Sequence, residues 1–358
     1  MNSQLKSVAR APCRVDPAGG GTDAPPYCNE YGGAVVNFSV ARYSYASFEW
    51  LPAGSGVRIY SHDQQQGVQA ASMKELRRDG RLDFVKAFAQ RLLPNATDFL
   101  LVTQSDTPER SGLGGSGAMG VALVGAITHA LGQQKSKHEI ALLANEIERH
   151  DLGHSGGNQD SFGAAIGGIK LIIYHQGGGC ACEKLTVPSP ARAQLERDAL
   201  LIYTGGVHLS GTIHADIKRS YALPNSPTIR AMDNLKAAAQ GMARALQAGN
   251  LDGYVDCLNR SRVNHYALHE SCDSEALRKF FHELAPHIRG GKTCGAGGGG
   301  FILVHMKPNR RKECVQIAEA LGGRAWNFKL DDDGLMTWSE PATTPEEFAA
   351  LRERFSRG

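Results

Sequence analysis

The sequence predicts an α+β protein of two domains. Residues 32–50 alternate apolar and polar residues and are rich in Val, Tyr and Phe, which is typical of strands. Residues 136–150 instead carry apolar residues at helical spacing. Over 176–192, Gly and Pro interrupt both patterns, and this change of composition predicts a connection between domains. We therefore expect domains at 1–180 and 181–358.

In the first half of the chain, the same patterns predict strands that alternate with helices. Ser136 and Glu139 have the spacing of a capping box at the start of a helix. Residues 117–133 are apolar nearly all round, as expected of a helix buried on most faces. We expect strands at the start of 7–27 and over 32–50, 56–63, 98–106 and 169–174, helices over 83–93, 117–133 and 136–150, and a loop with a short helical turn over 156–168.

The second half reads as a smaller sheet with more helices. A glycine run at 295–300 feeds an apolar, strand-like segment. We expect strands over 199–206, 301–306 and parts of 324–338, and helices over 226–248, 251–268, 273–287 and 310–322.

Charge and hydropathy exclude several classes of partner. The 358 residues include 39 Lys plus Arg against 36 Asp plus Glu, so a net charge of +3 gives no general attraction to nucleic acid or an anionic membrane. No stretch supplies the roughly twenty consecutive apolar residues of a membrane span, and the first fifteen residues lack the apolar core of a secretory signal. We expect a cytoplasmic protein.

The eight cysteines are scattered, and Cys180 and Cys182 form their one close pair. A zinc site needs a second pair or nearby histidines, which this spacing lacks. Reduced thiols are the better interpretation.

The stretch "RSGLGGSGAM" at 110–119 is the first candidate for function. Glycines at a helix start present unpaired backbone N–H groups and the positive end of the helix dipole, which together attract phosphate. A P-loop would need a lysine that this loop lacks, and a dinucleotide fold would need an acidic residue about twenty positions on. A phosphate cradle and a purely structural turn both remain open.

Other motifs favour one polyanion site. Thr22 and Asp23 follow three glycines, Asp160 lies in "GGNQDSFGAA", and Glu146 and Glu148 precede it on a helix. Carboxylates beside glycine loops are the parts that phosphoryl transfer from a Mg²⁺ nucleotide requires.

Three motifs in order resemble those of the GHMP family of small-molecule kinases: "APCRVDPAGGGTD" at 11–23, "SGLGGSGAM" at 111–119 and "CGAGGGGFILV" at 294–304. The resemblance covers nearly the whole chain and looks most like the sugar-1-kinase branch. It implies an N-terminal domain with a left-handed βαβ unit, which departs from the usual right-handed rule, a C-terminal ferredoxin-like domain, and an active site in the cleft between them.

The resemblance also implies ATP and Mg²⁺ as cofactors and a role for each matching residue. Asp160 would orient or accept the proton of the attacking hydroxyl, and Arg14 would neutralise charge on the transferred group. Ser116 and Glu148 would hold Mg²⁺. Residues expected to wrap the ATP phosphates are Gly112, Leu113, Gly114, Gly115, Ser116 and Gly117, and those expected to meet the sugar are Gly20, Gly21, Thr22, Asp23, His208, Gly297 and Gly298.

Each of these roles has a structural alternative. Asp160 could be only a helix cap, Glu148 a solvated residue paired with Arg149 or Lys137, and Asp23 the closure of an Asx turn.

The position of Asp160 at a helix start predicts a lowered pKa, because the helix dipole favours the charged carboxylate. Positioning of an anomeric hydroxyl, which is more acidic than an ordinary alcohol, then suits Asp160 better than early proton removal.

The implied acceptor is D-glycero-D-manno-heptose 7-phosphate, phosphorylated at its anomeric oxygen to supply nucleotide-heptose for a surface polysaccharide. The sequence departs from this branch after the "YTG" strand, where His208 stands in place of an arginine that could bind the distal phosphate. Lys218, Arg219 or Arg42 could compensate.

Other functions stay open. They are a kinase for an unphosphorylated fucose-like or mannose-like sugar, a decarboxylase of the same fold, and a non-catalytic nucleotide-binding regulator. Oligomer formation is possible.

Overall fold

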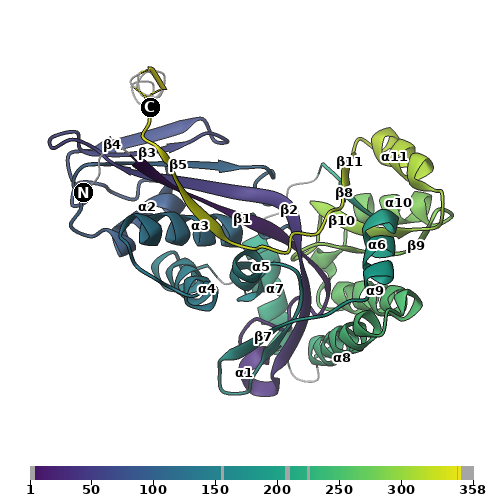
Figure 1. Cartoon of the computed structure of the whole chain (residues 1–358). Coiled ribbons are helices and arrows are strands. Elements are labelled where there is room, and N and C mark those ends of the chain that lie inside the picture. The colour runs from purple at the N-terminus through teal and green to yellow at the C-terminus, as the bar shows by residue number, and fades with distance from the viewer. Residues whose placement is uncertain (1–4, 155–156, 206–209, 224–225, 345, 348–358) are drawn as a thin grey trace.

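The computed structural model describes residues 5–154, 157–205, 210–223, 226–344 and 346–347. It consists of two sheets that lie side by side, with helices packed on them (Figure 1). The larger sheet has eight strands in the order β12-β1-β2-β5-β3-β4, with β6 pairing β2 and β7 pairing β6. Its strands are β1 (Leu5–Ala18), β2 (Gly33–Trp50), β3 (Val57–Ser61), β4 (Gln66–Ala70), β5 (Phe99–Ser105), β6 (Ile169–Tyr174), β7 (Cys180–Lys184) and β12 (Met336–Pro341).

The smaller sheet has the ferredoxin-like arrangement that the resemblance implied. Its four strands follow the order β11-β8-β10-β9, and helices connect β8 to β9 and β10 to β11. The strands are β8 (Ala199–Tyr203), β9 (Ile288–Thr293), β10 (Phe301–Met306) and β11 (Arg324–Asn327).

Helices cover both sheets. On the side of the larger sheet lie α1 (Tyr27–Tyr31), α2 (Asp83–Leu92), α3 (Gly115–Ala130), α4 (Lys137–Glu146), the π-helical turn η1 (Ile147–Asp151) and α5 (Gln159–Ile166). The second half adds α6 (Ser189–Asp198), α7 (Ser210–Tyr221), α8 (Pro227–Gln247), α9 (Leu251–Tyr266), the 3₁₀ turn η2 (Glu270–Cys272), α10 (Glu275–Leu284) and α11 (Arg311–Ala320).

The strongest local signals produced the expected elements. The predicted capping box is present, since Ser136 accepts from the backbone N–H of Glu139 while the Glu139 carboxylate accepts from that of Ser136. The four helices predicted in the second half correspond to α8, α9, α10 and α11. The predicted connection at 176–192 instead contains β7 and the start of α6, whose short, polar sequences gave no periodic signal.

Strands from near the two ends of the chain, β1 and β12, are neighbours in the larger sheet. β12 pairs antiparallel with β1, from Leu5 opposite Pro341 to Arg10 opposite Met336, and is the yellow strand beside the purple ones in Figure 1. β7 begins at the predicted domain boundary at residue 180 and β12 follows it, yet both belong to the larger sheet. A division at residue 180 therefore does not separate the two sheets. The two predicted domains stay a prediction.

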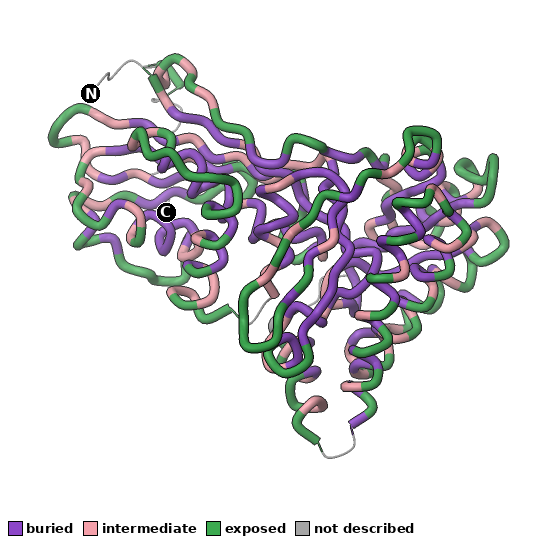
Figure 2. Tube along the Cα trace, turned by 60° about the horizontal axis from the view of Figure 1, so that its bottom comes forward, coloured by how far each residue is buried: buried purple, intermediate pink, exposed green. Residues whose placement is uncertain are grey.

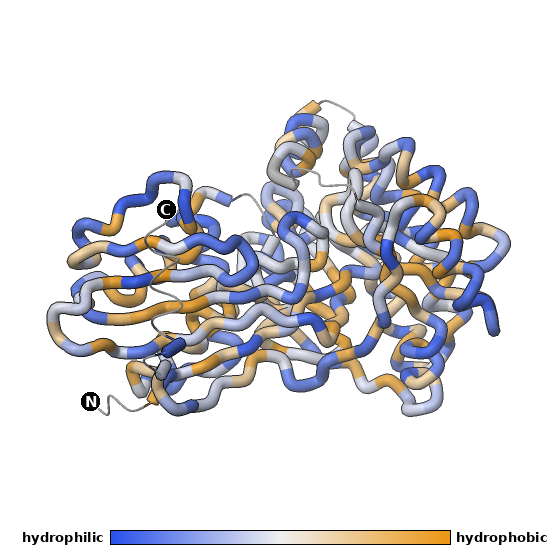
Figure 3. Tube along the Cα trace, turned by 90° about the horizontal axis from the view of Figure 1, so that it is seen from above, coloured by the Kyte–Doolittle hydropathy of each residue, from blue (hydrophilic) through white to orange (hydrophobic). Residues whose placement is uncertain are grey.

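One continuous core joins the two halves. Buried residues of β1, β2 and α3 pack with those of α8, α9 and β10, and Figure 2 shows buried chain running through the middle of the molecule. In Figure 3, hydrophobic segments run through the same middle region, while hydrophilic segments lie mostly at outer turns. Among the described residues, no helix is long and apolar enough to cross a membrane.

Candidate active site

A cleft of about 760 Å³ lies where the two halves meet. One wall comes from the glycine-rich loop before α3, with Arg14 of β1 beside it, and another from η1 and Asp160 of α5. The glycine loop at 294–299 and His214 of α7 close the side formed by the second half of the chain. The three glycine motifs of the sequence therefore contribute to this region from positions nearly 300 residues apart.

The glycine-rich loop ends in the N-terminus of α3. Gly114 is the N-cap, in the left-handed conformation with φ of 68°. A Cβ on Gly114 would lie 3.0 Å from Cγ of Arg14 and 3.2 Å from Cγ of Asp160, and one on Gly117 would lie 2.5 Å from Cβ of Asp160. Glycine is therefore required here because the loop, Arg14 and Asp160 touch directly.

Four of the six predicted phosphate-binding residues line the cleft: Gly112, Gly114, Gly115 and Ser116. Leu113 and Gly117 do not. The Leu113 side chain is fully buried in the core, and Gly117 is buried against Asp160. Only the backbones of these two residues could contribute, because neither presents a side chain to the cleft.

Arg14 and Asp160 form a close ion pair at the centre of the cleft. Nε and Nη2 of Arg14 both lie 2.7 Å from Oδ1 of Asp160, and Nη1 donates to the carbonyl of Gly112. The Asp160 side chain is 25% exposed, whereas that of Arg14 is 6% exposed. Arg14 therefore holds one oxygen of the carboxylate and the phosphate loop together.

The pKa of Asp160 differs from the sequence-based expectation. Asp160 does lie in the first turn of α5, but its pKa is raised rather than lowered. Burial is the main cause, and the charge of Glu148 adds to it while Arg14 opposes it. The expectation of a lowered pKa was wrong, because the cost of desolvating the carboxylate outweighs the stabilising effect of the helix dipole. A raised pKa makes Asp160 a better proton acceptor than the sequence suggested.

A buried pair that sequence reasoning missed attaches the third glycine loop to β1. Asp16 accepts from Nζ of Lys292 at 3.2 Å and from the N–H of Gly295 at 2.9 Å, and both residues are only 1% exposed. Burial acts to raise the pKa of Asp16, but Lys292 and then Arg14 lower it, and the lowering prevails. Asp16 and Lys292 are 276 residues apart, so no local pattern could have paired them.

The two predicted sugar-binding glycines of this loop behave differently. Gly297 lines the cleft, and a Cβ there would lie 2.5 Å from the carbonyl oxygen of Cys272. Gly298 is not among the residues that line the cleft, and its N–H donates to that same carbonyl at 2.8 Å. The third motif thus lines the cleft through Cys294 to Gly297 and Gly299.

Glu148 projects from the π-helical turn η1, an element that is often found at functional sites. Its side chain is 16% exposed, lines the cleft and contacts Nδ1 of His154 at 3.4 Å. Glu146, the other candidate, is 49% exposed and pairs with Arg91 outside the cleft. In the part of the chain that the structure describes, no three His, Cys, Asp or Glu side chains are grouped to hold a metal by themselves.

The predicted sugar residues 20–23 lie behind the cleft wall rather than on it. Thr22 is fully buried, and its hydroxyl donates to the carbonyl of Gly19 at 2.8 Å, so this side chain fixes the turn. Gly20 packs against Asp16, where a Cβ would lie 2.1 Å from the carboxylate. Gly21 approaches Leu268, with 3.4 Å between an added Cβ and that side chain.

Asp23 is the most unusual of these four residues. It is 3% exposed, accepts from the N–H of Gly21 at 3.1 Å and from N and Nε2 of Gln159 at 3.4 Å each. A Cβ at Gly157 would lie 1.6 Å from its carboxylate, so only glycine can cover it. Burial, with the charge of Asp160, raises the pKa of Asp23 to about 6. Asp23 therefore does more than close an Asx turn, because it also binds Gln159 at the start of α5.

Of the basic residues that the sequence suggested for a distal phosphate, Lys218, Arg219 and Arg42 do not line the cleft. His208 lies outside the described residues. Arg219 pairs with Asp216, and Arg42 stacks 5.0 Å above the ring of Trp326.

Besides Arg14, the basic side chains that line the cleft are Arg110, Arg149, His154 and His214. Arg149 donates to Oδ1 of Asn158 at 3.3 Å, and within the described chain it has no carboxylate within salt-bridge distance. His214 comes from α7, and burial lowers its pKa. Sequence reasoning missed the roles of Arg149 and His214 because neither residue belongs to a glycine motif.

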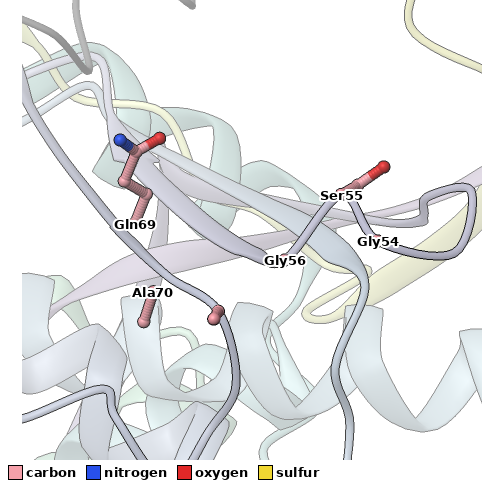
Figure 4. Close-up of a pocket in the computed structure, with 6 residues that line it drawn as sticks. Gly54, Ser55, Gly56, Gln69 and Ala70 are labelled. Carbon is pink, nitrogen blue, oxygen red and sulfur yellow. The ribbon is translucent and has the colours of Figure 1, made fainter.

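An apolar patch extends the cleft beyond the glycine loop. It is formed by Leu82, Phe84 and Val85 before and within α2, with Met119 on α3. Such a patch beside a phosphate cradle suits the base of a nucleotide. A separate hollow of about 470 Å³ on the β3–β4 hairpin is lined by Gly54–Gly56 and Gln69–Ala71 (Figure 4). It carries no charged side chain and no part of the chemistry described above.

Residues 82–168 match the GHMP kinases N terminal domain. The chain is 28% identical over 341 residues to a D-glycero-alpha-D-manno-heptose 7-phosphate kinase of Campylobacter jejuni, covering 93% of this chain and 99% of that one.

The crystal structure of a D-glycero-D-manno-heptose 1-phosphate kinase from Bacteroides thetaiotaomicron superposes with a TM-score of 0.78 at 28% identity, over 93% of this chain and 98% of that one. A bifunctional fucokinase/GDP-fucose pyrophosphorylase of Arabidopsis thaliana is 26% identical over 88% of this chain, which spans 31% of that longer protein.

Proposed function

We propose that this chain is an ATP-dependent sugar kinase of the GHMP type, to which it is similar, and that it phosphorylates the anomeric oxygen of D-glycero-D-manno-heptose 7-phosphate. The product is the 1,7-bisphosphate. The observation that carries the proposal is the Arg14–Asp160 pair, held 2.7 Å apart against the N-terminus of α3 in one cleft. It brings a proton acceptor and a fixed positive charge to the place where a phosphate would bind.

The nucleotide binds, in this proposal, along the glycine-rich loop. The first N–H groups of α3, from Gly115 to Gly117, have no partner within the helix and point along its axis. With the positive end of the helix dipole they attract the β- and γ-phosphates. The apolar side chains of α2 would receive the base.

Ser116 and Glu148 fit a hard divalent cation. Both line the cleft and offer oxygen ligands, and Glu148 has no Lys or Arg partner among the described residues. When bound, Mg²⁺ would neutralise charge on the phosphates of the nucleotide. Because the described residues hold no group of three His, Cys, Asp or Glu side chains that could bind a metal, ATP itself would complete the ligand set.

Asp160 orients the acceptor and receives its proton. One carboxylate oxygen is engaged by Arg14, and the partial exposure of the side chain leaves the carboxylate open to the cleft. The raised pKa and the acidity of an anomeric hydroxyl bring donor and acceptor closer in proton affinity. Arg14 lies where negative charge accumulates as the phosphoryl group moves. Positioning and electrostatics then supply most of the rate.

The distal phosphate of the acceptor is the finer part of the proposal. Arg149 and His214 are basic side chains in the cleft, and Arg149 has no carboxylate to neutralise it in the described chain. A guanidinium binds phosphate well because its donors match two oxygens at once. The two heptose kinases that resemble this chain are both named for phosphorylated heptoses.

A kinase for an unphosphorylated sugar is the second candidate. The similarity to a fucokinase favours it.

The test is ATP consumption with Mg²⁺ against heptose 7-phosphate, heptose 1-phosphate, heptose, mannose, fucose and galactose, followed by phosphorus NMR of the product. Formation of the 1,7-bisphosphate from the 7-phosphate supports the proposal. If only free sugars are turned over, the protein is a kinase but its acceptor is an unphosphorylated sugar. ATP binding without turnover on any acceptor overturns both candidates.

A further inference from the structure

A lysine lies fully buried beneath α5, the helix that carries Asp160. Lys170, on β6, has no exposed surface, and its ammonium donates three hydrogen bonds. The acceptors are Oδ1 of Asn37 at 3.2 Å, Oγ of Ser39 at 2.8 Å and the carbonyl of Gly168 at 3.0 Å. All three acceptors are neutral, so no carboxylate contacts this charge within the described chain.

This buried charge is costly to the fold. Burial lowers the pKa of Lys170 to about 7, and among its neighbours Asp331 and Cys182 favour its charged form while Lys184 opposes it. An apolar side chain of similar volume would avoid the cost of desolvating an ammonium. Stability of the core therefore does not explain a lysine at this position.

The two side chains that Lys170 holds are bound in turn to α5. Nδ2 of Asn37 donates to the carbonyl of Gln159 at 3.2 Å, and Oγ of Ser39 donates to the carbonyl of Gly163. These contacts fix the backbone one residue before Asp160 and three residues after it.

The start of α5 also contacts Asp23, the second buried carboxylate near the cleft. Gln159 donates to Asp23 through both its backbone N–H and its Nε2. Lys170 is thus connected, through Asn37 and Gln159, to Asp23 and to the backbone that aims Asp160.

We propose that Lys170 is a positioning residue for phosphoryl transfer: through Asn37 and Ser39 it fixes the start of α5, and with it the direction of the Asp160 carboxylate. The inference rests on the proposed function, because it assumes that Asp160 acts on the acceptor. It goes beyond that function in assigning a catalytic consequence to a side chain that touches neither substrate.

The first test compares Lys170→Met with Ile172→Ala. Ile172 lies two residues along β6 with a fully buried side chain, so its truncation weakens the same strand without a polar link to α5. Both variants are assayed at a temperature where circular dichroism shows them folded. We expect Lys170→Met to lower kcat by about tenfold or more while KM for ATP changes less than about threefold, since small misplacements at a reacting centre are costly.

Ile172→Ala should keep kcat within about twofold of the wild type, because no polar chain connects it to α5. Equal kcat for the two variants would overturn the inference and leave Lys170 a structural residue. A parallel fall in ATP affinity, measured by calorimetry, would also overturn it, because the loss would then not be specific to the chemical step.

If Lys170→Met does not fold, Ser39→Ala is the second test. It removes the hydroxyl that accepts from Lys170 and donates to the carbonyl of Gly163, and it leaves Lys170 two acceptors. We expect a kcat about threefold to tenfold lower with unchanged KM for ATP, and an unchanged kcat would refute the inference.

Asp160→Ala separates this inference from the proposed function. If that variant turns over normally, the proposed role of Asp160 fails and the inference fails with it. If it is inactive while Lys170→Met and Ser39→Ala are normal, only the inference fails.

Discussion

Asp23 is a carboxylate that the fold holds at an energetic cost. Its side chain is 3% exposed, and burial together with the charge of Asp160 raises its pKa to about 6. Replacing Asp23 with Asn removes the charge and keeps one oxygen that can accept from the N–H groups around it. We therefore expect Asp23→Asn to stabilise the protein.

The size of this effect follows from the pKa. The ordinary aspartate pKa of 3.8 applies to the unfolded chain, and the rise to about 6 in the folded protein corresponds to about 3 kcal/mol. Between these two pKa values the folded state binds more protons than the unfolded state, so stability falls as pH rises through this window. The cost is fully present above pH 6. Asp23→Asn should thus add about 3 kcal/mol at pH 8 and less than about 1 kcal/mol at pH 4.

Urea unfolding of the wild type and Asp23→Asn at pH 4, 6 and 8 measures this difference directly. Thr22→Val is a matched control, because it alters the neighbouring buried hydroxyl, which does not titrate. A stability difference between wild type and Asp23→Asn that does not grow from pH 4 to pH 8 would refute the reasoning.

Four further substitutions test the proposed site. Asp160→Asn should lower kcat by about a thousandfold with ATP affinity unchanged by calorimetry, and near-normal turnover would exclude its role. Gly117→Ala would place a Cβ 2.5 Å from that of Asp160, so kcat should fall about a hundredfold, whereas wild-type kinetics would show that the contact is unimportant. Glu148→Gln should raise the Mg²⁺ concentration for half-maximal rate about tenfold, and an unchanged value would remove Glu148 from the metal site. Arg149→Met should raise KM for a phosphorylated acceptor about tenfold but not KM for the free sugar, and an equal effect on both would contradict a distal phosphate contact.

The parts of this structure that sequence could predict are those set by local chemistry. Ser136 and Glu139 formed their capping box because both partners lie within one turn. Gly114 ended the loop and started α3 because only glycine tolerates that left-handed backbone beside Arg14. The predicted helix continued past Glu146 as the π-helical turn η1, which no periodicity would reveal.

The parts that could not be predicted depend on contacts between distant segments. Asp16 and Lys292 meet only after both halves have folded. The raised pKa of Asp160 arises from burial and from Glu148, neither of which a helix position alone discloses. Arg149 stands in the cleft because η1 turns it there, and its sequence neighbours give no signal of that role.

The pairing of β12 with β1 has a consequence for synthesis on the ribosome. Residues 336–341 complete the larger sheet by covering one edge of its first strand. Until that last strand emerges, β1 presents unpaired N–H and C=O groups, which can recruit strands of other chains. The N-terminal half therefore cannot reach its final hydrogen-bonded state while it is being made, and a fragment ending near residue 180 would keep an open, aggregation-prone edge.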